Sequence, residues 1–232
     1  MDVVLDGIVQ AFWLLARADS EVVRVTLLSL AVSATATLLS VAIGVPLGAF
    51  LAMGRLRGRQ GVISLVNTGM AFPPVIVGLV VTVLLWRSGP LGFFHMLYTP
   101  WAMVLAQFIL SLPIITGISM AAIQQVDPKL RLQLAALGAS RLQTFWVLVR
   151  ETRLPLMAAV MAGFGAVISE VGASMMVGGN ILGETRVLTT AIVMETGKGN
   201  FAVAMALSVV LMAMVYVVNA YLTFVQQRGR LR

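Results

Sequence analysis

The 232-residue chain contains no cysteine and a single histidine, His95. Disulfides, thiolate metal sites and histidine-cluster metal sites are therefore excluded. His95 lies in a predicted loop, and we assign it no role. Charged residues make up only 11% of the chain, whereas about 25% is typical of soluble domains. This scarcity of charge argues against a soluble protein.

Apolar residues, by contrast, are abundant. They make up 59% of the chain, and its mean hydropathy is +0.98, which predicts an all-α integral membrane protein. At about 20 residues per crossing, the length accommodates five transmembrane helices, with six possible, in a single domain over residues 1–232. No soluble catalytic domain fits beside them.

Uncharged runs locate the expected crossings. The five predicted spans are residues 25–53, 61–86, 101–123, 155–177 and 202–225. Pro73 and Pro74 interrupt the second. Residues 1–20 are amphipathic, and their apolar part is too short to cross easily, so we predict an interfacial helix there. Because this segment begins with Asp2 and Asp6 rather than basic residues, no cleaved signal peptide is expected.

The basic residues predict the orientation, since lysine and arginine collect in cytoplasmic loops. Three lie within 55–59, five within 129–153 and three within 228–232, which is eleven of the 16. Five spans place all eleven on one side. We therefore predict a cytoplasmic C-terminus and an external N-terminus, in a multi-pass protein of the cell membrane. The net charge of +7 is thus assigned to topology and not to nucleic-acid binding.

The predicted cytoplasmic loop, residues 124–153, has clear helix signals. Asp127 and Pro128 are expected to cap and begin a short amphipathic helix, Gly138 to end it, and Ser140 to cap a second helix. A short helix of this kind packs on its own bundle, lies among lipid headgroups or docks a partner protein. The pattern alone leaves these three interpretations open.

The loop sequence AALGASRLQTFWVLV, followed by RLP, resembles the cytoplasmic loop of permease subunits in ABC-type importers. The resemblance implies the type I ABC importer permease fold, with a coupling helix that docks in a groove of the partner ATPase. Leu132 departs from the family pattern, which usually has an acidic residue there. By resemblance, the residues that contact the ATPase are Ala135, Ala136, Gly138, Ala139, Ser140, Arg141 and Phe145.

A second resemblance is narrower. SEVGASMMVGGNILGETRVLTTAI, from Ser169, and FPPVIVGL, from Phe72, are similar to permeases of tungstate and molybdate importers, most of all to the tungstate branch. The resemblance implies a homodimer in the lipid bilayer, an external binding protein that delivers the oxyanion, and a dimer of ATPase subunits that binds ATP and magnesium. No cofactor is expected on this chain, which lacks the G-x-x-x-x-G-K-[ST] phosphate loop.

Glu170 stands out because it falls in the predicted fourth span. Insertion scales put an acid at a helix centre at about +3 kcal/mol, so its carboxylate should face the bundle interior or a water-filled cavity. Two interpretations stay open: a residue that orients or closes a gate, or a structural residue that pairs with backbone donors or with a basic residue such as Arg186 and so holds two helices together. The predicted translocation path or gate consists of Pro73, Pro74, Ser169, Glu170, Gly179, Asn180 and Thr185.

The residues around Gly179 also permit two interpretations. Gly178, Gly179 and Asn180 free the backbone to leave helical geometry beside a cavity, or they form a plain turn. A new helix that begins near Asn180 or Thr185 would offer N–H groups to a passing oxyanion.

The rival function is an ATP-independent channel or secondary transporter for a small anion. Broken helices and buried carboxylates occur in those proteins too, often with inverted repeats. We find no internal repeat in this sequence, and such a transporter would leave the cytoplasmic loop without a use.

Overall fold

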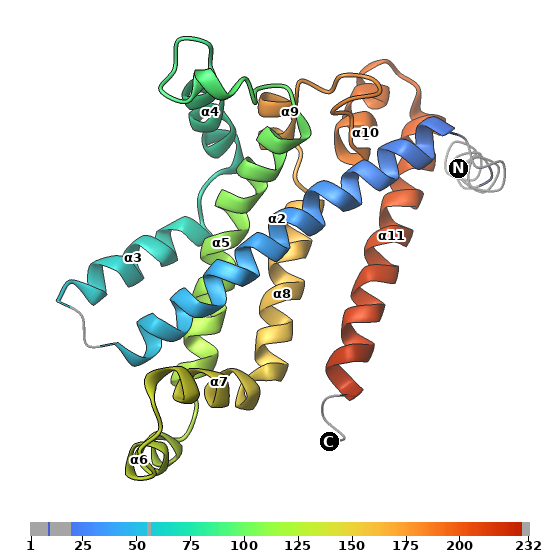
Figure 1. Cartoon of the computed structure of the whole chain (residues 1–232). Helices are drawn as coiled ribbons and strands as arrows, with labels where there is room; N and C mark the ends of the chain where they lie inside the picture. The colour runs from blue at the N-terminus through green and yellow to red at the C-terminus, as the bar shows by residue number, and fades with distance from the viewer. Residues whose placement is uncertain (1–8, 10–19, 55–56, 229–232) are drawn as a thin grey trace.

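A computed structural model describes residue 9 and residues 20–54 and 57–228, and the regular structure in these ranges is entirely helical (Figure 1). The predicted interfacial helix at residues 1–20 therefore lies outside the described residues, apart from Val9 and Ser20.

Within the described residues, three helices are long and apolar enough to cross a membrane: α2 (Ser20–Met53), α5 (Pro100–Gln124) and α11 (Phe201–Arg228). They contain the predicted first, third and fifth spans, which are confirmed. The 34 residues of α2 extend over about 51 Å, well beyond the roughly 30 Å of a bilayer core. A tilted crossing accommodates this excess length.

Two helix pairs are sharply bent. α3 (Arg59–Met70) meets α4 (Pro74–Leu85) at 104°, and α7 (Arg141–Glu151) meets α8 (Arg153–Ile168) at 76°. The predicted break at Pro73 and Pro74 is confirmed: Pro73 is extended, and Pro74 occupies the first turn of α4, where its missing N–H costs nothing. If each pair counts as one span, the described chain has five.

The predicted fourth span, residues 155–177, is wrong as one continuous helix. α8 ends at Ile168, and the short α9 (Gly172–Gly178) begins after a break. At the break the Ser169 hydroxyl donates to the Gly165 carbonyl at 2.8 Å, and the side chain of Glu170 bonds to the backbone of α9. These side-chain bonds offer the backbone an alternative to further helix.

The remaining elements are η1 (Gly92–Phe94), α6 (Pro128–Ala136) and α10 (Leu188–Gly197). One buried cluster joins α2, α4, α5, α8 and α9; it includes Val32, Val81, Met103, Val167 and Val177. A second joins α2, α10 and α11 through Val25, Leu188 and Leu207. Both clusters hold the loops at the ends of the bundle in place.

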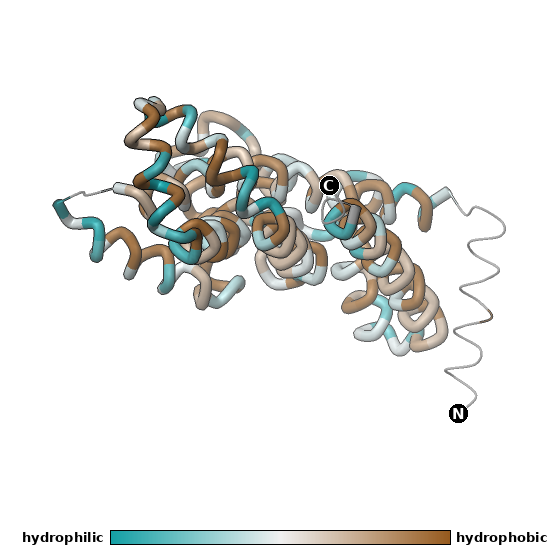
Figure 2. The backbone as a smooth tube through the Cα atoms, turned by 90° about the horizontal axis from the view of Figure 1, so that it is seen from below, coloured by the Kyte–Doolittle hydropathy of each residue, from teal (hydrophilic) through white to brown (hydrophobic). Residues whose placement is uncertain are grey.

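Hydrophobic residues run along most of the length of the long helices (Figure 2), and many of their side chains are exposed. Leu38, Leu65, Val83 and Met212 are among the large apolar side chains that are exposed. A helix that is apolar all round suits contact with lipid or with a second subunit.

The two regions selected from the sequence lie at opposite ends of the bundle. α6 and α7 sit at the same end as the C-terminal end of α11, whereas α9 and the start of α10 sit at the other (Figure 1). Any action of one region on the other must therefore pass along the long helices.

Candidate coupling loop and candidate gate

The first helix of the cytoplasmic loop begins and ends as its sequence predicts. The Asp127 carboxylate accepts the backbone N–H of Lys129 at 2.8 Å, and Pro128 follows as the first helical residue. Gly138 has φ +73°, which glycine adopts without the strain that a side chain causes. The Ala139 N–H then donates to the Leu134 carbonyl at 2.9 Å, which closes the helix end.

The second helix has the predicted serine cap. The Ser140 hydroxyl accepts the Gln143 N–H at 3.3 Å, and the Gln143 side chain accepts the Ser140 N–H at 2.8 Å. This reciprocal capping box satisfies two N–H groups that would otherwise be unpaired. Residues 138–140 thus form a defined corner between α6 and α7.

Two contacts fasten this corner to the long helices. The Arg131 guanidinium donates from Nη2 to the Ile123 carbonyl at 2.6 Å, near the end of α5. Phe145 and Leu130 pack against a buried cluster that includes Ala49 of α2 and Ile123 of α5. A displacement of the corner is therefore transmitted to both α2 and α5.

The outer surface of the loop is apolar and uncovered. Leu137 is 82% exposed and Trp146 is 61% exposed, and Leu132 and Leu142 are exposed as well. The predicted coupling residues divide between two environments: Ala135, Ala136, Gly138, Ser140 and Arg141 are exposed, whereas Ala139 and Phe145 are half-buried. Uncovered apolar surface of this kind marks an interaction site.

A groove of about 800 Å³ lies beside the corner. Its walls come from the end of α2, with Pro46, Phe50 and Met53, and from the loop, with Ala139, Arg141 and Phe145. The structure thus brings three of the seven predicted coupling residues to one cavity.

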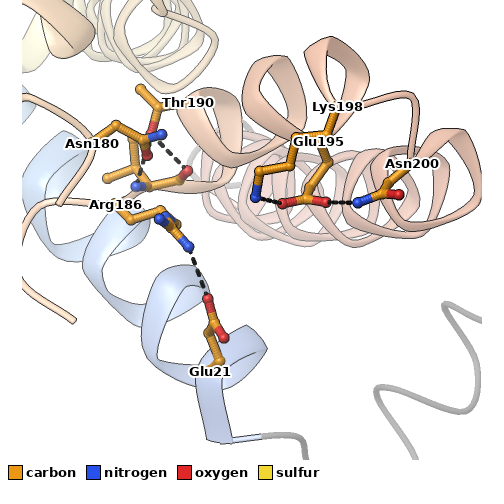
Figure 3. A network of polar contacts seen from close by, with 8 residues as sticks. Glu21, Asn180, Arg186, Thr190, Glu195, Lys198 and Asn200 are labelled. Atoms are coloured by element: carbon orange, nitrogen blue, oxygen red, sulfur yellow. Dashed lines mark hydrogen bonds and ion pairs between the residues drawn. The ribbon is translucent and has the colours of Figure 1, made fainter. Parts of the chain in front are cut away.

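Glu170 lies in the break between α8 and α9, with only 9% of its surface exposed. Its carboxylate Oε1 accepts the backbone N–H of Ala173 at 2.9 Å, in the first turn of α9. Its carbonyl accepts the Thr189 hydroxyl of α10 at 3.0 Å. The suggested pair with Arg186 is wrong, because the Arg186 guanidinium instead contacts Glu21 at 3.1 Å (Figure 3).

The break also lies against the start of α4. A Cβ added at Gly172 would come within 2.9 Å of the Val75 side chain, and one at Gly78 within 2.7 Å of the Ala173 Cα. The structure therefore brings the α4 helix, which follows the predicted Pro73–Pro74 break, together with the segment that follows Glu170. Ser169 is exposed and bonds back to α8.

Gly179, Asn180 and Thr185 form a closed turn. Gly179 and Asn180 have positive φ. The buried Thr185 hydroxyl donates to the Gly178 carbonyl at 2.5 Å and accepts the Ile181 N–H at 3.0 Å. The Asn180 side chain accepts the Thr190 hydroxyl at 2.9 Å (Figure 3). These polar atoms satisfy one another within the chain, which supports the turn interpretation.

Of the two interpretations that the sequence left open, the one with a new helix near Asn180 or Thr185 does not hold. α10 begins at Leu188, whose N–H donates to the Ser29 hydroxyl at 2.8 Å, and the Val187 N–H donates to Thr190 at 3.1 Å. Because the closed turn comes first, α10 begins only at Leu188. The N–H groups at its start already have acceptors within the chain.

Sequence reasoning missed two polar contacts near the end of α10 and the start of α2. The Glu195 carboxylate accepts from Lys198 and Asn200, at 2.8 Å each (Figure 3). The hydrogen bond from Lys198, and then that from Asn200, lowers the pKa of Glu195 below its ordinary value. The spacing of Glu195 and Lys198, three residues apart on one helix, signals this contact. The Glu21–Arg186 pair carries no such signal, because 165 residues separate its members.

Residues 44–230 match the family described as "Binding-protein-dependent transport system inner membrane component". The chain belongs to this family. It is 44% identical to a probable anion ABC transporter permease protein of Haloferax volcanii, with 85% of this chain and 88% of the relative covered. It is also 38% identical to the tungstate uptake system permease protein TupB of Peptoclostridium acidaminophilum, with 98% and 100% covered.

The fold has a counterpart among solved structures. The chain is similar to a chain of the inward-facing MetNI methionine ABC transporter, with a TM-score of 0.76 at 19% identity over 90% of this chain and 96% of that one. This likeness confirms the predicted type I ABC importer permease fold. The chain is thus a multi-pass permease of the inner membrane.

Proposed function

We propose that this chain is the transmembrane permease subunit of an ATP-driven ABC importer that carries tungstate into the cytoplasm. Its family and its likeness to a tungstate uptake permease over nearly the whole chain support this function. Molybdate has the same charge and tetrahedral shape as tungstate, so it is the alternative substrate.

The observation that carries the proposal is the exposed corner between α6 and α7. It presents apolar side chains such as Leu137 outward, while Arg131 and Phe145 hold it to the ends of α5 and α2. An ATPase docked on this corner pushes or pulls two long helices at once. Coupling requires such an element, with two packed arrangements whose balance ATP shifts.

The partners follow from this arrangement. One chain offers one docking corner, so a homodimer engages a dimer of ATPase subunits, which bind the ATP and magnesium. An extracytoplasmic binding protein selects the oxyanion and delivers it. The corner then faces the cytoplasm together with the C-terminus, in line with the eleven basic residues predicted for that side.

We place the outer gate where α9 packs against α4. Gly78 lets the two helices approach, and the breaks at Pro73–Pro74 and at Glu170 flank them. Here Glu170 acts as a positioning residue for α9 and not as a ligand, since an acid in the path would repel a dianion.

Uptake in proteoliposomes tests the function. Vesicles that contain the permease, its partner ATPase and tungstate-loaded binding protein should accumulate tungstate only with ATP. Mutation of the phosphate-loop lysine of the ATPase should abolish uptake. Undiminished uptake with that mutant would favour the ATP-independent channel or secondary transporter.

A further inference from the structure

A small cavity opens between the start of α2 and the loop that precedes α10. Its volume is about 290 Å³, and its walls include the charged residues Glu21, Arg24 and Arg186. Leu182 and Gly183 of the loop and Val25 and Leu28 of α2 complete most of the remaining wall. It lies at the end of the bundle opposite the α6–α7 corner.

Arg186 is a partly buried cation of this cavity, with a side chain that is 15% exposed. Its Nη1 contacts the Glu21 carboxylate at 3.1 Å, but its buried Nε has no hydrogen-bond partner in the described part of the chain. A buried donor without a partner is unfavourable, and a guanidinium presents several donors in one plane. Arg186 therefore has capacity for a further acceptor.

Arg24 brings a second guanidinium to the same cavity. A Cβ added at Gly183 would lie 3.3 Å from Arg24 Nη1, so the guanidinium rests close to the backbone of this glycine. Gly183 also has φ +78°, which disfavours any side chain there. The lack of a side chain at Gly183 thus leaves room for the Arg24 guanidinium against the loop.

The charges in the cavity wall favour an anion. Two arginines and the carboxylate of Glu21 line the cavity, whereas Glu184, which follows Gly183 in sequence, is not part of the wall. Glu195, which interacts electrostatically with Arg186, is also outside the wall and accepts hydrogen bonds from Lys198 and Asn200. The Glu21 side chain is 56% exposed, so its carboxylate can turn into solvent while α2 stays folded. The Glu21 carboxylate contacts Arg186 through an anionic oxygen. An oxyanion would offer the same kind of acceptor.

We propose that Arg186 and Arg24 form a binding site for a tetrahedral oxyanion at the external mouth of the permease. Glu21 is the resident counter-ion, which the arriving anion displaces from Arg186. Arginine suits this task because its planar fork matches the spacing of oxygens on such groups. That the anion is the transported tungstate rests on the proposed function. The phosphate of a lipid headgroup shares the chemistry, so the test separates the two.

The experiment uses the whole permease–ATPase complex in phosphatidylcholine nanodiscs, without binding protein, titrated calorimetrically with tungstate. Arg186→Gln should raise the Kd about ten-fold or more, as the loss of a charge-assisted contact predicts. Glu21→Gln should lower the Kd, because the competing carboxylate is gone. A merely structural ion pair would not give tighter binding in Glu21→Gln. Lys129→Gln, which removes an exposed cation on α6 at the opposite end of the bundle, is the control and should leave the Kd unchanged.

Phosphatidylglycerol nanodiscs distinguish the two sources of the anion. If a lipid headgroup is the occupant, anionic lipid weakens tungstate binding, and Arg24→Gln and Arg186→Gln release bound phosphatidylglycerol in native mass spectrometry. If free oxyanion is the occupant, native mass spectrometry shows the same bound phosphatidylglycerol in the wild type and in both arginine variants. Equal tungstate affinity of wild type, Arg186→Gln and Glu21→Gln, with no arginine-dependent lipid, overturns the site. If the Arg186→Gln complex does not assemble, the tungstate Kd of Glu21→Gln tests the site by itself. A Kd below that of the wild type supports the site, and an unchanged Kd overturns it.

ATP-dependent uptake by the wild-type complex separates this site from the proposed function. Uptake that is intact without arginine-dependent binding overturns the site and leaves the importer standing. Arginine-dependent binding without ATP-driven uptake overturns the importer and leaves the site standing.

Discussion

The Glu170 carboxylate accepts the backbone N–H of Ala173, three residues along the chain, at 2.9 Å. The acid is therefore bound to the first turn of α9 and lies between two helices rather than within one. This relationship explains how a carboxylate is accommodated in so apolar a chain, and it leads to the first prediction.

Replacement of Glu170 by alanine should destabilise the permease by about 1–3 kcal/mol, because the buried Ala173 N–H loses its acceptor. Glu170→Gln retains an acceptor oxygen and should cost less. Thermal unfolding of the detergent-solubilised protein measures both. The matched control is Ser169→Ala, at an exposed neighbour. Equal unfolding temperatures for Glu170→Ala and Ser169→Ala would contradict the role of Glu170 in holding α9.

The same variants test the proposed gate. Glu170→Gln should alter the basal ATPase rate or the leak of anion from proteoliposomes, since it weakens the contact that positions α9. A variant that changes neither rate would show that Glu170 is structural alone.

Gly138→Trp should weaken pull-down of the partner ATPase while membrane insertion stays normal. No atom lies within 4 Å of a Cβ added at Gly138, so the loop has room for the side chain, but the ATPase surface docked on it does not. The positive φ adds a cost of about 1–2 kcal/mol for any side chain. Gly138→Ala therefore measures the backbone effect alone. Gly165→Ala, in an equally open part of α8, is the control, and normal association of Gly138→Trp would refute docking at this corner.

Arg131→Met should uncouple ATP hydrolysis from transport. The variant loses the 2.6 Å hydrogen bond to the Ile123 carbonyl, which ties α6 to the end of α5, but it keeps the stem of the side chain. We expect fewer tungstate ions carried per ATP hydrolysed, measured in the same proteoliposomes. Lys129→Met removes an exposed cation from the same helix and should leave this ratio unchanged. An equal fall of the ratio in both variants would mean that the loss of a positive charge, and not the loss of the hydrogen bond to Ile123, causes the uncoupling.

Glu195 should show a pKa below its ordinary value of 4.5, because Lys198 and Asn200 donate to the charged form. A lowered pKa stabilises the folded state above the ordinary value, and that stability is lost as the pH falls through the folded pKa. Lys198→Met should return the pKa toward 4.5, which carbon NMR of the labelled carboxyl group measures. An unchanged pKa in this variant would remove Lys198 as the main cause.

Local sequence signals predicted the structure well where the relevant contacts are local. Asp127, Gly138 and Ser140 act within three or four residues of their own positions, so the helices of the cytoplasmic loop could be placed from the chain alone. The long uncharged spans followed in the same way from the lack of charge. Prolines marked the bend between α3 and α4.

Contacts between distant segments could not be predicted. α9 packs against α4, and the partner of Arg186 lies on α2, so both contacts join segments that are far apart in the sequence. In the sequence Thr185 is an ordinary polar residue, yet its hydroxyl makes the two hydrogen bonds that close the turn. The bonds that the candidate gate residues make could therefore not be predicted from the sequence.

Gly48 of α2 faces the backbone of α5 so closely that an added Cβ would lie 2.7 Å from the Thr116 carbonyl oxygen. Helices locked together at such short range cannot slide past each other without a clash of main chains. α2 and α5 should therefore behave as one rigid lever during the transport cycle. The conformational change must then be absorbed at the joints between helices, at residues 71–73 and 169–171, so distance measurements across these joints are where alternating access should become visible.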